Sequence, residues 1–317
     1  MPAYPRHEIV ADDRVGLYHC IVRCVRRAFL CGDDPVSGKN HDHRKEWIRL
    51  RLQELAAVFG IDVCGYAVMS NHFHVVLRVR PDLAQGWSDE EVALRWRLLY
   101  RPRDETTGLQ TEPGQQDLNI IMSGPARVVQ LRDRLASLSW FMRCLNEPIA
   151  RAANREDNCS GRFWQGRFRS VVLLDEAAVL ACSVYVDLNP IRAGVAGTPE
   201  ESEFTVEAEA RPRRSRPKLA ARASDRGYLP IELEKYLSLV DWTGRELRAG
   251  SRGTIPGPLS PILDRLGQSG ECWLETVRHF GRWFKRAAGG RDSLAAAAMR
   301  CGRRWFQGQC AAKIAFQ

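Results

Sequence analysis

The chain has 317 residues, of which 44% are hydrophobic, and its 47 Lys and Arg against 38 Asp and Glu give a formal net charge of +9. No apolar run approaches the roughly 18 residues of a membrane span. The polar start MPAYPRHEIVADDR lacks the apolar core of a signal peptide. The sequence therefore argues against a membrane-spanning or secreted protein and predicts a cytoplasmic one. The positive charge favours a polyanionic partner, although it also fits a basic protein that binds no nucleic acid.

The first 80 residues predict three strands and one helix. Residues 17–24 are rich in β-formers and predict a strand. Residues 41–59 carry apolar side chains near helical spacing, which predicts an amphipathic helix. Two further strands are predicted at 61–69 and 71–79, and the short connection between them indicates a tight hairpin.

The next hundred residues predict an insertion, two helices and a fourth strand. Residues 81–128 are rich in Pro, Gly and charges, so we expect a loop insertion with one short helix. Residues 132–154 predict a long helix that Pro148 would kink or divide. Residues 161–174 predict a strand, and 177–188 predict a helix.

This order of elements predicts an α+β domain, with helices packed on an antiparallel sheet, over residues 1–197. An acidic run and then a basic, Pro-containing run follow, so residues 198–227 are predicted to be a charged linker. Residues 228–317 contain several helical patterns and enough Trp to bury a small core. We therefore expect a helical C-terminal region there.

The most informative short motif is His72-Phe73-His74. In a strand, residues i and i+2 point to the same face, so both imidazoles would project side by side as ligands of one metal ion. Two exposed histidines on a hairpin strand are the alternative. His19 is expected to be structural, and the similar pair His41 and His43 is expected to lie on the surface.

A second group of residues lies at the end of the predicted helix 177–188. Tyr185 and Asn189 are four residues apart and share a helix face, and Pro190 biases Asn189 out of helical geometry, which frees its amide. A tyrosine phenolate can attack phosphorus, and a neighbouring metal ion can polarise the phosphate. The alternative for Tyr185 is a core tyrosine.

Three segments in this order, GYAVMSNHFHVVL, GRFWQGRFRS and YVDLNPIRAG, resemble the HUH single-strand tyrosine transposases. The similarity is strongest to the REP-associated branch of the insertion-sequence-200-like group, and it covers about residues 14–197. The resemblance implies a ferredoxin-like antiparallel sheet, and we expect its helices on one face. The implied activity is that of a transposase that cuts and rejoins single-stranded or hairpin DNA.

The resemblance also implies roles for individual residues. His72, His74 and Asn189 would bind Mg²⁺ or Mn²⁺, of which two imidazoles and one amide suit Mn²⁺ better. Tyr185 would attack the scissile phosphate and leave a 5′-phosphotyrosine and a free 3′-OH.

Arginines interleaved with aromatic residues form a candidate DNA-binding surface, because such surfaces bind phosphates and stack unpaired bases. An edge strand with solvated arginines is the alternative. The candidate DNA-binding residues are Arg23, Arg26, Arg27, Arg162, Trp164, Arg167 and Arg169. The Arg-rich C-terminal helices could either add DNA contacts or carry ordinary solvated charge.

Two other functions fit the same sequence. One is a non-catalytic regulator that binds hairpin DNA, and the other is a metal hydrolase that does not bind nucleic acid. The sequence leaves open whether the protein is a monomer or a homodimer.

Overall fold

The computed structural model describes residues 14–25, 29–35, 37–104, 106–193, 231–249 and 260–316. The predicted linker 198–227 and the candidate residues Arg26 and Arg27 lie outside the described residues. The predicted order of strand, helix, strand, strand, helix, strand, helix is confirmed. These elements are β1 (Gly16–Arg23), α1 (His43–Val58), β2 (Ile61–Val68), β3 (His72–Val79), α6 (Leu138–Glu156), β4 (Arg169–Leu173) and α7 (Glu176–Asp187).

The strands form one sheet in the order β2-β3-β1-β4-β5. β1 lies between β3 and β4 and pairs antiparallel with both, while β5 (Ala287–Ala288) pairs parallel with β4. The first four strands and the helices α1 and α6 give the βαββαβ connectivity of a ferredoxin-like sheet. The predicted α+β class with an antiparallel sheet is therefore confirmed.

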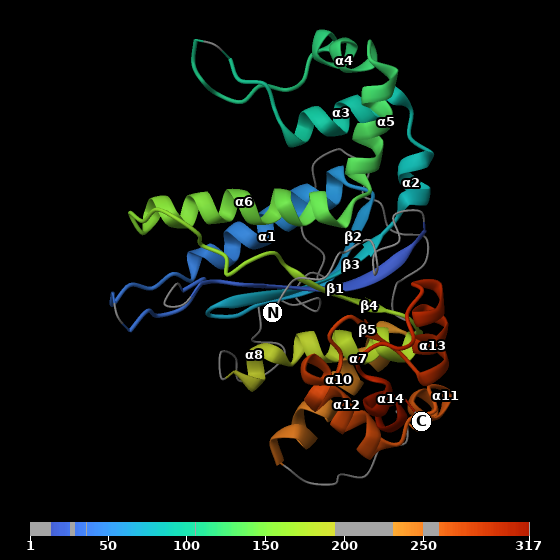
Figure 1. Cartoon of the computed structure of the whole chain (residues 1–317). Coiled ribbons are helices and arrows are strands. Elements are labelled where there is room, and N and C mark those ends of the chain that lie inside the picture. The colour runs from blue at the N-terminus through green and yellow to red at the C-terminus, as the bar shows by residue number, and fades with distance from the viewer. Residues whose placement is uncertain are drawn as a thin grey trace.

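The two ferredoxin-like helices lie together on one face of this sheet, as expected, whereas the cover of the other face by α7 and the C-terminal helices was not predicted. Figure 1 shows α1 and α6 on one face and α7 with the C-terminal helices on the other. The physical reason lies in α7, which is buried on almost every side. A helix that is apolar all round must be covered by two layers, here the sheet and the C-terminal helices.

The insertion at 81–128 contains more helix than the expected loop with one short helix. Among its described residues, four helices form, the last of which continues past residue 128. They are α2 (Pro81–Gln85), α3 (Asp89–Leu99), α4 (Gln115–Met122) and α5 (Pro125–Leu135). The helices pack on a few well-spaced apolar side chains, among them Val92, Leu118 and Val128, all of which are buried. In Figure 1, α3, α4 and α5 lie beyond α1 and α6, on the side of the sheet that these two helices cover.

Two predicted boundaries differ from the structure. The helix predicted at 132–154 breaks at Ala136 and Ser137, between α5 and α6, and then continues through Pro148 to Glu156. Pro148 has no N–H to donate to Cys144 O, and the Arg51 side chain donates a 3.0 Å hydrogen bond from its Nε to that carbonyl instead. Of the strand predicted at 161–174, only the residues of β4, Arg169–Leu173, form a regular strand.

The C-terminal region packs on α7 and extends the sheet through β5. Gly290 N donates a 2.7 Å hydrogen bond to Asp175, the N-cap residue of α7, and the Tyr236 hydroxyl donates to the buried Asp187. The domain boundary near 197 stays a prediction. The helices of this region are α10 (Leu233–Ala249), α11 (Ser260–Arg265), α12 (Gly270–Trp283), α13 (Arg291–Arg300) and α14 (Gln309–Ala315).

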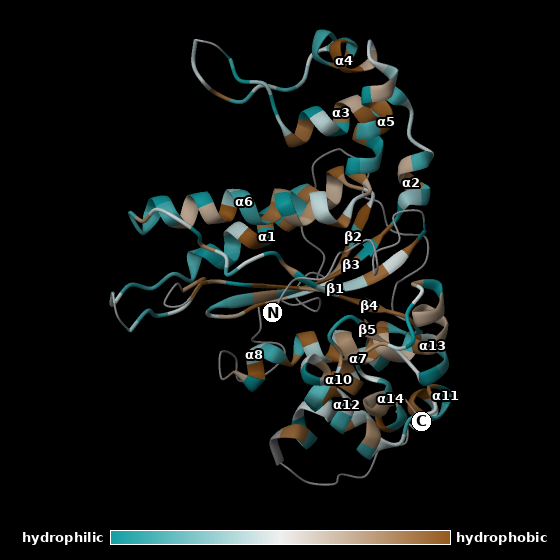
Figure 2. Cartoon of the chain, viewed as in Figure 1, coloured by the Kyte–Doolittle hydropathy of each residue, from teal (hydrophilic) through white to brown (hydrophobic). Residues whose placement is uncertain are grey.

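The larger apolar layer of the core lies between the sheet and the helices α1 and α6. In Figure 2 the strands are coloured mostly as hydrophobic. Phe73 lies in this layer with 0% of its surface exposed, edge-on to Trp164 at 5.8 Å between ring centroids. Within the described ranges, no helix is long and apolar enough to cross a membrane.

Phe73→Ala is expected to lower the free energy of unfolding by about 3–5 kcal/mol, because it removes a fully buried aromatic ring. Urea unfolding followed by circular dichroism measures this difference. Ile120→Ala is the matched control, since Ile120 is 66% exposed and should change stability by less than about 0.5 kcal/mol. Equal losses in the two variants would contradict the assigned core.

Candidate active site

The pairing of β1 and β3 places His72 and His74 on the face of the sheet that α7 covers. His72 lies opposite Arg23 and His74 opposite Ile21, while Phe73 points into the other layer. The two imidazole ring centroids are 5.0 Å apart. The strand period thus brings both rings together, as predicted from the spacing.

A third histidine, His19 of β1, completes this group. Its Nε2 lies 2.8 Å from His74 Nδ1, and the two buried rings stack with centroids 5.0 Å apart. If His74 Nδ1–H donates this hydrogen bond, His74 Nε2 keeps its lone pair for a metal ion. The earlier expectation gave His19 only a structural role, whereas this contact can also fix the tautomer of His74.

The electrostatics keep these imidazoles neutral. Burial, followed by the charge of Arg23, lowers the pKa of His72 to about 4. Burial also lowers the pKa of His19 to about 3 and that of His74 well below its usual value. Neutral imidazole is the form that binds divalent metals.

One observation tests whether these residues fit a metal ion. His74 Nε2 is buried, and no hydrogen-bond partner for it exists in the described part of the chain. A buried polar atom without a partner is costly, and a cation beside it would remove that cost. Two neutral imidazoles side by side are donors that suit a divalent transition metal such as Mn²⁺. Asn189 as a third ligand stays a prediction.

Tyr185 lies on the side of α7 that faces the histidines. Its ring centroid is 5.7 Å from that of His74 and 6.0 Å from that of His19. The ring is half-buried and packs against the apolar cluster of α7 and the C-terminal helices, so the alternative of a core tyrosine stays open. Its hydroxyl packs on α12, because a Cβ added at Gly281 would lie only 2.6 Å from the Tyr185 oxygen.

Asn189 begins α8 (Asn189–Arg192), one turn after Tyr185. Burial raises the pKa of Tyr185, and the Arg192 charge and a side-chain hydrogen bond with Asn189 act in the opposite direction. The Arg192 guanidinium lies 5.8 Å from the centre of the Tyr185 ring and donates a 2.9 Å hydrogen bond to Arg278 O. The two residues predicted from the second motif therefore lie together.

Positive charges surround this group. Arg169 on β4 lies opposite Ile21 of β1, and its charge contributes to the pKa shifts of His19, His74 and Tyr185. Lys285 is close enough to Arg169 that this charge, after burial, lowers the pKa of the Lys285 amine. A phosphate group entering here would meet favourable electrostatics from several directions.

Of the other candidate DNA-binding residues, Arg23 lies opposite His72 in the sheet. Arg162 and Arg167 are exposed on the segment before β4. Trp164 packs against the opposite layer, where its indole N–H donates a 2.9 Å hydrogen bond to Asn146 O. Contact of these residues with DNA stays a prediction.

Several residues at this site were not found from sequence. Arg192 lies inside the motif YVDLNPIRAG, so its position was available but its role was not. Phe280 and Gly281 come from α12, almost a hundred residues later. The Phe280 ring lies 5.6 Å from the Tyr185 ring and 6.2 Å from the His19 ring, a contact for which no local pattern gives a signal.

The metal-free protein is expected to lose stability as the pH falls below about 6.5. Unfolded histidines bind protons there, whereas folded His19, with a pKa of about 3, does not. The unfolded state is therefore favoured by up to about 1.4 kcal/mol per pH unit for this residue. Urea unfolding between pH 7 and 4 should show a shallower pH dependence for His19→Gln, and an unchanged slope would contradict the assignment.

No protein-family model matches the sequence, and no curated protein matches it significantly. One solved structure that resembles the chain is described as a REP-associated tyrosine transposase bound to a REP hairpin. The two chains share 13% identity and a TM-score of 0.39, over 73% of this chain and 100% of the other. Similarity at this level is too low for the transfer of a function or of residue roles.

Proposed function

We propose that this chain is a metal-dependent DNA nickase and strand transferase, a transposase in which Tyr185 cleaves and rejoins single-stranded DNA. The observation that carries the proposal is the 5.7 Å separation of the Tyr185 and His74 rings, with His72 on the same face of the sheet. The group combines a phenol, neutral imidazoles and basic side chains around them. These are the parts that phosphoryl transfer to a tyrosine requires.

In the proposed site, His72, His74 and Asn189 hold Mg²⁺ or Mn²⁺. When bound, the ion supplies positive charge that polarises a phosphate oxygen. Arg169 and Arg192 attract and orient the DNA backbone beside Tyr185. The same chain supplies the nucleophile and both imidazoles, which supports action by a single subunit, either as a monomer or within a homodimer.

The cleavage step forms one bond and breaks one. The Tyr185 oxygen loses its proton to water and attacks the scissile phosphorus, and the bond from phosphorus to the 3′ oxygen breaks. The leaving 3′ oxygen takes up a proton, which gives a 3′-OH and a 5′-phosphotyrosine. Attack by a 3′-OH on this linkage reverses the exchange and rejoins strands without ATP.

End-labelled DNA tests this proposal, with a pool of random single-stranded oligonucleotides that each carry a hairpin. The pool is incubated with the protein and Mn²⁺ and then separated on a denaturing gel. A 5′-phosphotyrosine keeps the DNA on the 3′ side of the cut, so only the 3′-labelled pool should give a protein-bound band. The absence of a bound band with either label would contradict the proposed enzyme.

A non-catalytic regulator that binds hairpin DNA is the second candidate, and one observation favours it. The Tyr185 hydroxyl packs against Gly281 of α12, which leaves little space beside the nucleophile. A regulator would bind the same oligonucleotides reversibly, with strong salt dependence and without a covalent band. A metal hydrolase without a nucleic-acid partner would show neither result.

A further inference from the structure

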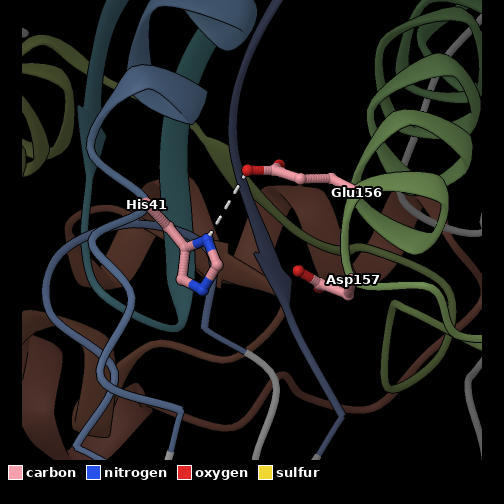
Figure 3. A group of neighbouring side chains, drawn as sticks. All are labelled: His41, Glu156 and Asp157. Atoms are coloured by element: carbon pink, nitrogen blue, oxygen red, sulfur yellow. Dashed lines mark ion pairs between the residues drawn. The ribbon is translucent and has the colours of Figure 1, made fainter.

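A second group of potential metal ligands lies on the other side of the sheet, where the start of α1 meets the end of α6. One ligand atom each from His41, Glu156 and Asp157 lies within 4.8 Å of the others. His43 lies at the edge of this group, with its Nε2 2.8 Å from Glu156 Oε1. Figure 3 shows the His41 ring directed at Glu156, with Asp157 beside it.

His41 is the residue that points to a ligand. The expectation that it lies on the surface is wrong, because it is only 4% exposed. Its Nδ1 is buried without a hydrogen-bond partner among the residues that the structure describes. The nearest carboxylate oxygen is Glu156 Oε1 at 3.9 Å, which is beyond hydrogen-bond distance. Burial of an imidazole nitrogen in this way is unfavourable unless another group satisfies it.

The two carboxylates are oriented by Arg44, which is fully buried. Its Nε donates a 2.9 Å hydrogen bond to Glu156 Oε2, and a second nitrogen pairs with Asp157. Glu156 Oε1 is thereby turned toward the two histidines. Carboxylate ligands are commonly fixed by outer hydrogen bonds of this kind, which leave the other oxygen for the metal.

The charges also permit a divalent cation. Glu156 and Asp157 carry two negative charges and Arg44 one positive charge, which leaves this group one negative charge in excess. An ion pair network that ties α1 to α6 would account for Arg44 and the carboxylates. It would not account for the unpartnered nitrogen of His41.

We propose that His41, His43, Glu156 and Asp157 form a Zn²⁺ site that holds α1 and α6 together, separate from the site at Tyr185. Zn²⁺ takes four tetrahedral ligands of this nitrogen and oxygen type, whereas Mg²⁺ prefers oxygen alone. Ligand atoms about 2.0–2.1 Å from zinc in a tetrahedron lie about 3.4 Å apart. The distances of 2.8 and 3.9 Å to Glu156 Oε1 lie on either side of this value.

Zinc binding by the full chain tests this site. In a His72→Gln/His74→Gln background, which removes the other imidazole pair, equilibrium dialysis should find one Zn²⁺ per chain. Co²⁺ as a substitute probe should give the visible absorption of a four-coordinate ion. Adding His41→Gln should abolish both signals, while circular dichroism confirms that each variant is folded.

His279→Gln is the matched control, because His279 forms a similar pair with Glu275 at 3.3 Å but belongs to no such cluster among the described residues. It should leave zinc binding unchanged. A folded background protein that binds no Zn²⁺ would overturn the proposal and leave only the ion pair network. If that background does not fold, the measurement is made on the chain that keeps His72 and His74. His41→Gln must then lower the zinc bound by that chain by one ion per chain.

Discussion

Tyr185→Phe is expected to abolish the covalent protein–DNA adduct and to lower strand cleavage by at least about 10⁴-fold. The substitution removes one oxygen atom, the proposed nucleophile, and leaves the ring between His74 and Phe280. Single-turnover cleavage of a 3′-labelled oligonucleotide with Mn²⁺ measures the loss. Binding of the same oligonucleotide, followed by fluorescence anisotropy, should change by less than about threefold.

Tyr100→Phe is the control for this variant. Tyr100 is also partly exposed but lies at the end of α3 in the insertion, away from the histidines. It should cleave as the unmodified chain does. Full adduct formation by Tyr185→Phe would rule out Tyr185 as the nucleophile and would require another hydroxyl to take that role.

Replacement of His72 and His74 by Gln is expected to weaken Mn²⁺ binding at this site by at least about 100-fold and to remove metal-dependent cleavage. Each substitution takes away one neutral nitrogen donor, and even changes to groups behind a ligand cost about 10- to 100-fold. Mn²⁺ binding measured by electron paramagnetic resonance gives the affinity, and the adduct assay gives the activity. The two losses should occur together.

His279→Gln again serves as the control, since it removes an imidazole from α12 without touching the pair on β3. Addition of EDTA to the unmodified chain should reproduce the loss of cleavage, and excess Mn²⁺ should restore it. Adduct formation by the double variant at the normal metal concentration would show that the histidines do not hold the catalytic ion.

Local patterns predicted the parts of this molecule that depend on local geometry. The strand period was enough to place His72 and His74 side by side with Phe73 on the opposite layer. The helical period likewise placed Asn189 one turn beyond Tyr185. Both relations depend only on a few neighbouring residues.

The features that sequence reasoning missed depend on distant contacts. His19 joins the histidines because β1 pairs with β3, which no spacing within β1 reveals. Gly281 reaches Tyr185 only because α12 packs on α7. The helices of the insertion were missed for a different reason, since frequent Pro and Gly hid a few well-placed apolar side chains such as Leu118.

The parallel pairing of β5 with β4 has a consequence for biosynthesis. About 110 residues separate these strands, and the helix that covers Tyr185 also comes from the last part of the chain. At about 10 residues per second, the ribosome needs roughly ten seconds to make that stretch. During this time the edge of β4 and the outer face of α7 have no cover, so a nascent chain at this stage should be a substrate for chaperones.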